Sequence, residues 1–281
     1  MPLYKEAAEA AQVTGESEPA VLDRNTLVKR GFEQPQWYLE KRSFNIRIRA
    51  ETVKQFLGAR RFESMLDIGC GDGSISVPLL AAHNRLTLLD MSTTMLGIAK
   101  ARIPAELSSR VEIVNDRFMQ AKLKTGGYDL IICLGVLAYI DDPQSFAEKL
   151  LSLLKPGGSL VLECTDSSHP VNYLVQLIGR TRSLFRTSKF LLVHHSSSNI
   201  AEIFTRLGFK LCAVFRYTLP PSGIRTLLRQ EFLYKTVRTL HGTSAHNRLA
   251  WLGDECIFYF RDTGREETPE SIPSPPTALK H

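Results

Sequence analysis

The sequence lacks the features of membrane-spanning, secreted and disulfide-stabilised proteins. No stretch of about 18 consecutive apolar residues, the length of a membrane-spanning helix, occurs along the chain. The opening residues MPLYKEAAEAAQ do not follow the basic, apolar and small-residue order of a secretory signal. The five cysteines are odd in number and widely scattered, so they predict small buried side chains rather than a disulfide framework or a zinc site. We therefore expect a soluble cytoplasmic protein without a bound metal.

Both ends of the chain have little large apolar content. Residues 1–25 are rich in Ala and Glu, and residues 263–281 consist mainly of Pro, Ser and charged residues. Such segments bury too little apolar surface to fold, so we expect both to be disordered. Residues 26–262 are long enough to bury a large core and are interpreted as one domain.

Within this domain, hydrophobic periodicity predicts an α/β fold. Apolar residues at helical spacing in residues 34–58 predict a helix that ends at Gly58. The predicted strands lie at residues 64–68, 85–90, 111–115, 128–134, 159–164, 209–217 and 255–260, and further helices near 73–83, 94–102, 143–154 and 198–207. Strands that alternate with helices form a parallel sheet covered on both faces. The last two strands lack a crossover helix, which indicates an antiparallel addition at the edge.

Three glycines follow the first predicted strand in the sequence LDIGCGDGS. They are Gly69, Gly71 and Gly73, and they come directly after Asp67. Ligands of doubly wound sheets bind where the strands end, and a glycine lets a ligand approach the main chain because it has no Cβ. A dinucleotide loop usually has a third glycine where Ser74 stands here and an apolar residue in place of Asp67. A carboxylate repels a pyrophosphate and attracts ammonium and sulfonium groups, so the loop favours a cation-bearing nucleoside over NAD.

The pattern D-x-G-x-G-x-G resembles the first motif of the class I S-adenosylmethionine-dependent methyltransferases. Later landmarks follow in order across residues 45–262: Asp90 ends the second strand, Asp116 follows the third, and LLKPGGSLVLE forms a helix-to-strand turn. The resemblance implies that Asp90 accepts the ribose hydroxyls, that Asp116 holds the adenine amino group, and that the end of the fourth strand contacts the methionine part. The cofactor-binding residues implied are Asp67, Gly69, Gly71, Gly73, Asp90, Met91, Asp116, Arg117 and Leu134.

The implied fold is a Rossmann-like, seven-stranded, doubly wound sheet, mostly parallel with an antiparallel last strand. It carries a helical N-terminal lid and helical insertions at about 164–197 and 218–254. In the lid, Trp37 and Tyr38 either close the site or simply fasten the lid to the core. Arg47 or Arg49 is expected to pair with the methionine carboxylate.

Methyl transfer from a sulfonium needs alignment and exclusion of water more than it needs a dedicated catalytic group. A base is required only if the acceptor must lose a proton. The undecided candidates for such a base are His194, His195, His241, His246 and Tyr139. A serine is expected to cap the helix near 198–207, which would place the first two histidines near the cofactor end of the sheet.

The sequence identifies the methyl acceptor less clearly than the cofactor. The sequence lacks the Asn/Asp-Pro-Pro-aromatic tetrapeptide of amino-group nucleic-acid methyltransferases and the Pro-Cys nucleophile of the cytosine C5 type. Val171–Ala250 carries twelve Lys and Arg against two acids, an excess of +10 in a chain of net charge +6. This segment is either a solvated helical cap or a cap that recognises an amphipathic or anionic small molecule and contacts an anionic membrane surface.

We therefore predict methylation of an oxygen, nitrogen or carbon of a small molecule, as in methyltransferases of the ubiquinone, menaquinone or secondary-metabolite type. An RNA-modifying methyltransferase and a cofactor-binding regulatory protein without turnover remain as alternatives. A nucleic-acid partner is disfavoured because no RNA-binding module is appended. The oligomeric state is left open.

Overall fold

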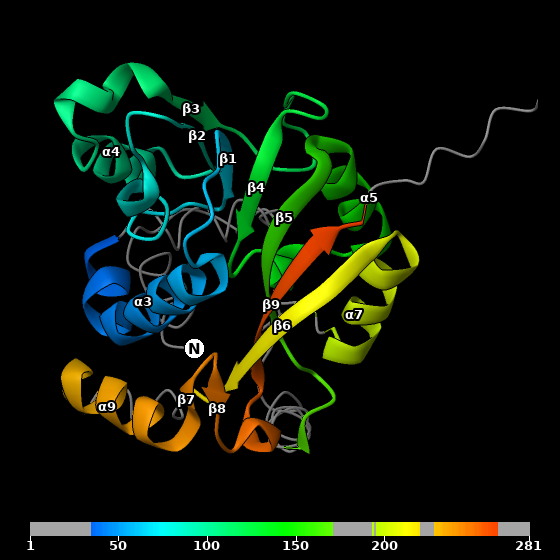
Figure 1. The fold of residues 1–281 in the computed structure, drawn as a ribbon. Helices are drawn as coiled ribbons and strands as arrows, with labels where there is room; N and C mark the ends of the chain where they lie inside the picture. Colours follow the sequence, from blue (N-terminus) through cyan, green and yellow to red (C-terminus); the bar gives the residue numbers. More distant parts are fainter. Residues whose placement is uncertain (1–34, 171–192, 194, 220–227, 264–281) are drawn as a thin grey trace, which may run out of the picture.

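The computed structural model describes residues 35–170, 193, 195–219 and 228–263, and it centres on a seven-stranded sheet with helices on both faces (Figure 1). The strands of this sheet are β1 (Ser64–Ile68), β2 (Arg85–Asp90), β3 (Val111–Asn115), β4 (Tyr128–Cys133), β5 (Leu154–Thr165), β6 (Phe209–Tyr217) and β9 (Glu255–Asp262). The α-helices are α3 (Pro35–Leu57), α4 (Thr93–Ala101), α5 (Pro143–Leu153), α7 (Ser197–Arg206) and α9 (Gln230–His241). A small hairpin pairs β7 (Gly242–Thr243) with β8 (His246–Asn247), and 3₁₀ turns occur at η1 (Val77–Leu79), η2 (Ala105–Arg110), η3 (Leu137–Tyr139) and η4 (Ala250–Leu252). The segments 1–25 and 263–281, which are predicted to be disordered, lie outside the described residues except for Thr263.

The strand order confirms the predicted Rossmann-like sheet. The strands follow one another as β3-β2-β1-β4-β5-β9-β6, and all neighbouring pairs from β3 to β5 are parallel. The last strand, β9, is antiparallel to both β5 and β6 and lies between them, so β6 forms the edge. Chain order reverses at β1 and β4, which creates the switch point where ligands of such sheets bind.

One predicted helix is wrong. The segment 73–83 forms turns and only the short η1, whereas the other predicted helices match α3, α4, α5 and α7. Pro78 lies within η1 and has no N–H to donate, and Gly73 adopts a left-handed φ of 72°. The Asn84 side chain then bonds to the backbone of Leu79 and Ala81, which replaces the hydrogen bonds of a helix.

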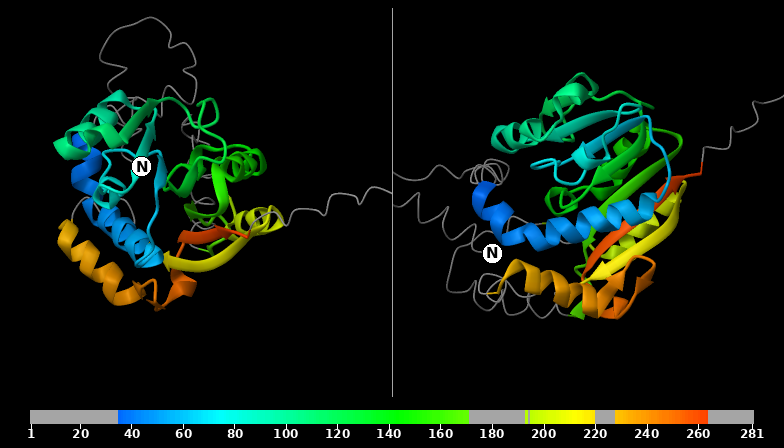
Figure 2. Two further views of the ribbon diagram at one scale, coloured as in Figure 1. Left: turned by 45° about the horizontal axis from the view of Figure 1, so that its top comes forward. Right: turned by 60° about the vertical axis from the view of Figure 1, so that its left-hand side comes forward.

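Each face of the sheet has its own core. Along β4, Ile131 and Cys133 point to the face covered by α5 and α7, while Leu130 and Ile132 point to the face covered by α3, α4 and α9. Figure 2 shows α9 running beside α3 on this second face. None of the helices in the described ranges is long and apolar enough to cross a membrane.

Candidate functional site

A cavity of about 410 Å³ lies beyond the carboxyl ends of β1, β2, β3 and β4. Because these strands are parallel neighbours, the loops that follow them meet at one edge of the sheet. Among the nine predicted cofactor-binding residues, the following line the cavity: Gly69, Gly71, Asp90, Met91, Asp116, Arg117 and Leu134. The other two, Asp67 and Gly73, are not part of the lining that the structure describes. The sequence motif therefore combines wall residues with residues that support the loop from behind.

The glycine loop turns sharply because Gly69, Gly71 and Gly73 all have positive φ angles. The N–H groups of Gly69 and Cys70 both donate to the carbonyl of Leu89, at 2.8 and 3.1 Å, which ties the loop to the end of β2. A Cβ on Gly69 would lie 2.4 Å from Val136 Cγ2, and one on Gly73 would lie 2.8 Å from Val77 Cγ2. Gly73 is thus required for packing beneath the loop, whereas Gly69 and Gly71 also leave the main chain open to the cavity.

Asp90 holds the glycine loop and faces the cavity. Its Oδ2 accepts the N–H of Gly71 at 2.9 Å, and its Oδ1 accepts the N–H of Ser92 at 2.8 Å. Burial raises the pKa of Asp90, while these backbone N–H groups oppose that rise. The next wall is formed after β3, where the exposed Asp116 accepts the N–H of Arg117 at 2.7 Å. Two carboxylates thus face the cavity from neighbouring strand ends.

Asp67 lies beneath the loop rather than on the cavity wall. It is 3% exposed, and its Oδ2 has no hydrogen-bond partner among the described residues. Burial, together with the charges of Asp90 and Asp72, raises the pKa of Asp67 to about 7. Near neutral pH this carboxyl group is therefore partly neutral, and Asp90 is the acid that lines the cavity.

Helix α3 supplies arginines to the opposite wall. Arg42 and Arg49 both line the cavity. Arg49 pairs with Glu163 at the end of β5, with a distance of 2.9 Å between Nε and Oε1. Arg47 does not line the cavity but pairs with Glu51 at 3.1 Å and Glu231 at 3.2 Å. Of the two arginines predicted to meet the methionine carboxylate, the structure places Arg49 at the site. Trp37 and Tyr38 belong to α3, but their side chains lie outside the described residues.

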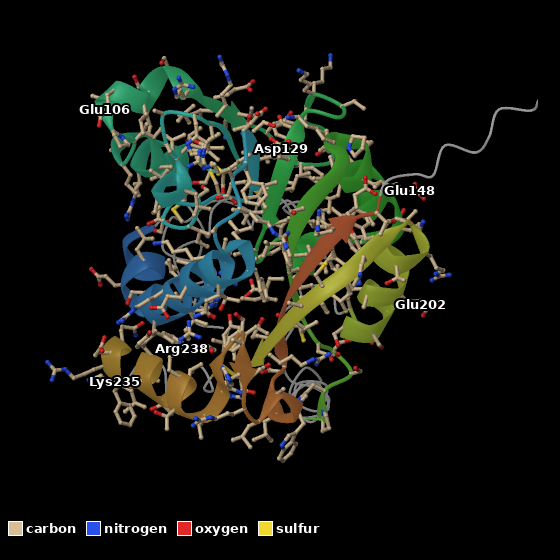
Figure 3. All side chains as sticks on the ribbon, viewed as in Figure 1. Glu106, Asp129, Glu148, Glu202, Lys235 and Arg238 are labelled. Atoms are coloured by element: carbon tan, nitrogen blue, oxygen red, sulfur yellow. The ribbon has the colours of Figure 1, made fainter. Side chains whose placement is uncertain are left out.

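Helix α9 is fastened to α3 by Glu51. This carboxylate accepts the hydroxyl of Tyr234 at 2.8 Å and the guanidinium of Arg238 at 2.6 Å, and Figure 3 shows Arg238 where α9 faces α3. Burial raises the pKa of Glu51, but the hydrogen bonds from Tyr234 and Arg238 outweigh burial and lower it. The second insertion is therefore held against the same helix that reaches into the cavity.

Of the five candidates for a general base, Tyr139 lines the cavity. His195 is buried, and its Nε2 lies 2.8 Å from the carbonyl of Ile140, a cavity residue. His241 is buried in the second insertion, where its Nε2 accepts the N–H of Thr218 at 3.3 Å, and burial lowers its pKa. His246 is exposed in the β7–β8 hairpin, and His194 lies outside the described residues. Tyr139 is thus the candidate that the structure brings to the cavity.

Some cavity residues were not predicted from the sequence. The clearest examples are Met95, Phe118, Val136 and Ile140, which supply apolar surface around the polar wall. Gly135 was also missed, although its φ of 75°, two residues after the end of β4, marks a turn comparable to the glycine loop. Its place in the sequence CLGV, after a buried strand, was the signal that pointed to it.

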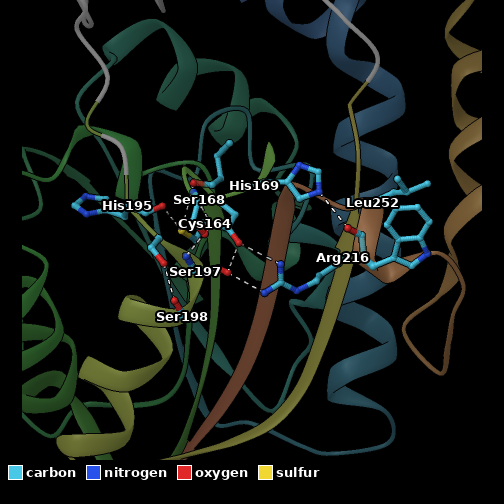
Figure 4. Close-up of polar contacts among 12 residues, drawn as sticks. Cys164, Ser168, His169, His195, Ser197, Ser198, Arg216 and Leu252 are labelled. Atoms are coloured by element: carbon cyan, nitrogen blue, oxygen red, sulfur yellow. Dashed lines mark hydrogen bonds and ion pairs between the residues drawn. The ribbon is translucent and has the colours of Figure 1, made fainter. Parts of the chain in front are cut away.

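A second polar cluster joins the two ends of the first insertion (Figure 4). Asp166, just after β5, accepts the N–H groups of Ser168 at 3.0 Å and Ser197 at 3.2 Å and pairs with Arg216 at 3.3 Å. Burial raises the pKa of Asp166, but these hydrogen bonds outweigh burial and hold it at about 2. Asp166 also replaces the predicted serine cap, because the Ser196 side chain makes no capping bond to α7.

Comparison with known proteins agrees with this geometry. Residues 66–160 match the methyltransferase domain family. Residues 66–160 therefore form a methyltransferase domain. A ubiquinone biosynthesis O-methyltransferase from Bordetella avium is 30% identical over 135 residues, which cover 47% of this chain and 54% of that relative. The chain thus spans about half the length of the curated relatives it matches.

Solved structures share the fold over more of the chain than residues 66–160. An S-adenosylmethionine-dependent methyltransferase from Thermotoga maritima has a TM-score of 0.58 at 15% identity, covering 83% of this chain and 97% of that chain. The N-methyltransferase NodS from Bradyrhizobium japonicum, in complex with S-adenosylhomocysteine, has a TM-score of 0.54 at 18% identity with the same coverage.

The cavity residues of the methyltransferase domain fit S-adenosylmethionine. Asp90 and Asp116 offer acceptors for hydroxyl and amino hydrogens, and Arg49 offers donors to a carboxylate. The carboxylate of Asp90 faces the cavity and gives it a negative potential suited to a cation. In the described residues, no group of three or more His, Cys, Asp or Glu side chains is arranged to hold a metal ion.

Proposed function

We propose that this protein is a cytoplasmic enzyme that transfers a methyl group from S-adenosylmethionine to an oxygen, nitrogen or carbon of a small molecule. The observation that carries the proposal is the cavity in which Gly69, Gly71, Asp90 and Arg49 meet beyond the switch point of the sheet. The relatives named as ubiquinone biosynthesis O-methyltransferases support a small acceptor and favour oxygen.

The bound cofactor supplies a methyl group already activated by the positive sulfonium, so the chain has to align it and exclude water. Asp90 accepts hydroxyl hydrogens of the ribose while its backbone contacts keep the loop in place, and Asp116 accepts the adenine amino group. Arg49 binds the carboxylate of the cofactor. Val136 and Ile140 cover the reacting groups with apolar surface.

Tyr139 is the residue we assign to proton removal when the acceptor is a hydroxyl or a protonated amine. It lies on the cavity wall in η3, directly before the carbonyl that His195 contacts. Its phenol must lose a proton to act as a base, so the activity should rise with pH. A Tyr139→Phe variant that keeps full activity at all pH values would exclude this role.

The test of the function is incubation of the purified protein with methyl-labelled S-adenosylmethionine and metabolite extract from its source, followed by mass spectrometry. A labelled small molecule is expected, and it should be lost in Asp90→Asn but kept in Asp129→Asn. Asp129 is a matched control because it also accepts two backbone N–H groups, from Glu63 and Ser64, but at the opposite end of the sheet.

The same experiment separates the alternatives. Label that appears in an RNA fraction would favour the RNA-modifying enzyme, and binding of S-adenosylhomocysteine without any labelled product would favour a regulatory protein. Tight binding of NADH without binding of S-adenosylhomocysteine would contradict the function altogether.

We further propose that the acceptor is amphipathic or anionic and that the second insertion contacts an anionic membrane surface. Large apolar side chains are exposed there together with arginines: Phe232, Leu240, Leu249, Trp251, Arg229 and Arg248. Trp251 is 74% exposed, which suits a membrane interface. Co-sedimentation with vesicles of phosphatidylglycerol, compared with phosphatidylcholine, tests this contact. If neither the wild type nor Trp251→Ser sediments with the anionic vesicles at low salt, the proposed membrane contact is contradicted.

A further inference from the structure

Arg49 and Glu163 form a buried ion pair at the wall of the cofactor cavity. Glu163 Oε1 accepts a hydrogen bond from Arg49 Nε at 2.9 Å, and Glu163 Oε2 is in ion-pair contact with Arg49 Nη2, so the two groups meet at two points. The side chains are 10% and 2% exposed, respectively. Only the arginine belongs to the cavity lining, and a Cβ on Gly135 would lie 3.3 Å from its Nη2. The guanidinium thus fits between a carboxylate behind it and the backbone of the cavity wall.

The carboxylate is also contacted from β6. The hydroxyl of Tyr217 lies 3.1 Å from Glu163 Oε1 and 2.8 Å from Asn45 Oδ1 on α3, so these two acceptors share its single hydrogen. Tyr217 is fully buried, so its ring fixes the place of the hydroxyl. Glu163, on β5, therefore has a fixed neighbour on β6 besides the arginine.

A buried ion pair contributes little to the stability of a fold. Removing two charges from water is unfavourable, and well-packed apolar residues often serve stability as well or better. Contacts at two nitrogens do, however, fix the plane and the rotation of a guanidinium, which a single contact does not. In Arg49 these two nitrogens are Nε and Nη2, and the residue as a whole lines the cavity.

We propose that Glu163 is a positioning residue that sets the Arg49 guanidinium to receive the carboxylate of the cofactor. This inference rests on the proposed function, because it concerns the same site. Glu163 does not touch the cofactor in this arrangement. It acts through Arg49, and its contribution is confined to ligands that carry a carboxylate.

Two ligands separate this role from a structural one. S-adenosylhomocysteine carries the amino-acid carboxylate, whereas 5′-methylthioadenosine has the same adenosyl thioether without it. Glu163→Gln keeps the size of the side chain but removes its charge and one acceptor oxygen. By calorimetry we expect this variant to bind S-adenosylhomocysteine about tenfold more weakly and methylthioadenosine within about twofold of wild type.

Tyr217→Phe is the second variant, in case Glu163→Gln fails to fold. It removes one hydrogen bond to the carboxylate and no charge, so we expect a smaller loss of about threefold for S-adenosylhomocysteine alone. Arg49→Lys should show the same selectivity as Glu163→Gln, and the double variant should be no weaker than the weaker single variant.

The outcomes are distinct. If Glu163→Gln binds both ligands as wild type does, or loses both equally, Glu163 does not position Arg49 and the inference is overturned. If wild-type protein binds neither ligand, the proposed function fails instead. Circular dichroism and thermal unfolding of each variant show whether a loss of both ligands follows from a loss of fold.

Discussion

Two parts of the molecule are held together in different ways. We call the residues around the cavity the cofactor half, and the two insertions with their contacts to α3 and β6 the cap half. Around the cavity, main-chain groups carry the structure: the N–H groups of Gly69 and Cys70 share one carbonyl of β2, and Asp90 accepts the N–H of Gly71. In the cap, side chains far apart in sequence carry it, as in the pair of Glu51 and Arg238, which are 187 residues apart. Backbone contacts follow from a local motif, whereas contacts of the second kind depend on the finished fold.

We expect the largest loss of stability for a substitution in the glycine loop, where a Cβ would clash with a neighbouring side chain. Gly69→Ala places a Cβ 2.4 Å from Val136 Cγ2 at a φ of 68°. Strain and overpacking together should lower the free energy of unfolding by about 3 kcal/mol and weaken binding of S-adenosylhomocysteine. Urea unfolding followed by circular dichroism measures the stability, and calorimetry measures the affinity.

Gly97→Ala is the control for this substitution. No atom lies within 4 Å of a Cβ at this position, which is in the middle of α4. Alanine is a better helix former than glycine, so stability should rise by about 1 kcal/mol. Equal destabilisation of both variants would show that the loop does not depend on a side-chain-free backbone.

The next effect concerns the carboxylate that ties the glycine loop to β2. Asp90→Asn can accept only one of the two N–H groups of Gly71 and Ser92 and loses its charge toward the ribose. A lost charged hydrogen bond corresponds to roughly a tenfold to hundredfold decrease in affinity for S-adenosylhomocysteine. The matched Asp129→Asn should leave that affinity unchanged, and a decrease in both would mean that the loss follows from general loosening of the sheet.

Much of the cofactor half was predictable because its signals are local. The strands at 64–68, 85–90 and 111–115 were placed with the bounds that the structure has, because each is a short segment rich in apolar residues. Gly69, Gly71 and Asp90 were likewise placed at the cavity. The helix expected at 73–83 failed because periodicity does not register Pro78 and the side-chain bonds of Asn84, which favour turns.

The cap half could not be predicted in the same way. Nothing local to Glu51 indicates that Tyr234 and Arg238 will meet it, and nothing near Asp166 indicates a contact with Arg216. The choice between Arg47 and Arg49 shows the limit within one helix. Both are arginines two positions apart, and only the packing of α3 on the sheet decides that Arg49 reaches the cavity.

Asp166→Asn tests whether a single carboxylate closes the base of the first insertion. It weakens the pairing with Arg216 and the contacts to Ser168 and Ser197, so we expect a loss of about 2 kcal/mol at pH 7. Because the folded pKa is lowered to about 2, this stability is present above about pH 4 and is lost as pH falls toward 2. The difference between wild type and variant in urea unfolding should therefore shrink at pH 3.

Glu202→Gln is the matched control for Asp166. Glu202 pairs with Arg206 on the surface of α7 at 3.7 Å, with both side chains 65% exposed. Exposed pairs contribute less than about 1 kcal/mol, so this variant should unfold nearly as wild type does. If this variant loses as much stability as Asp166→Asn, then charged side chains at α7 stabilise the fold in general, and Asp166 has no particular role in closing the first insertion.

The smallest effect concerns the buried acid beneath the glycine loop. Burial raises the pKa of Asp67 to about 7, above its value in the unfolded chain, so its contribution to stability is present at low pH and is lost as pH rises through 7. Between pH 6 and 8, wild type should lose about 1 kcal/mol relative to Asp67→Asn in urea unfolding. Glu255, whose pKa burial also raises to about 7, is present in both proteins, so the difference isolates Asp67. Parallel stability curves would show that Asp67 is ionised throughout, and the cofactor half would then contain a fixed buried charge as the cap half does.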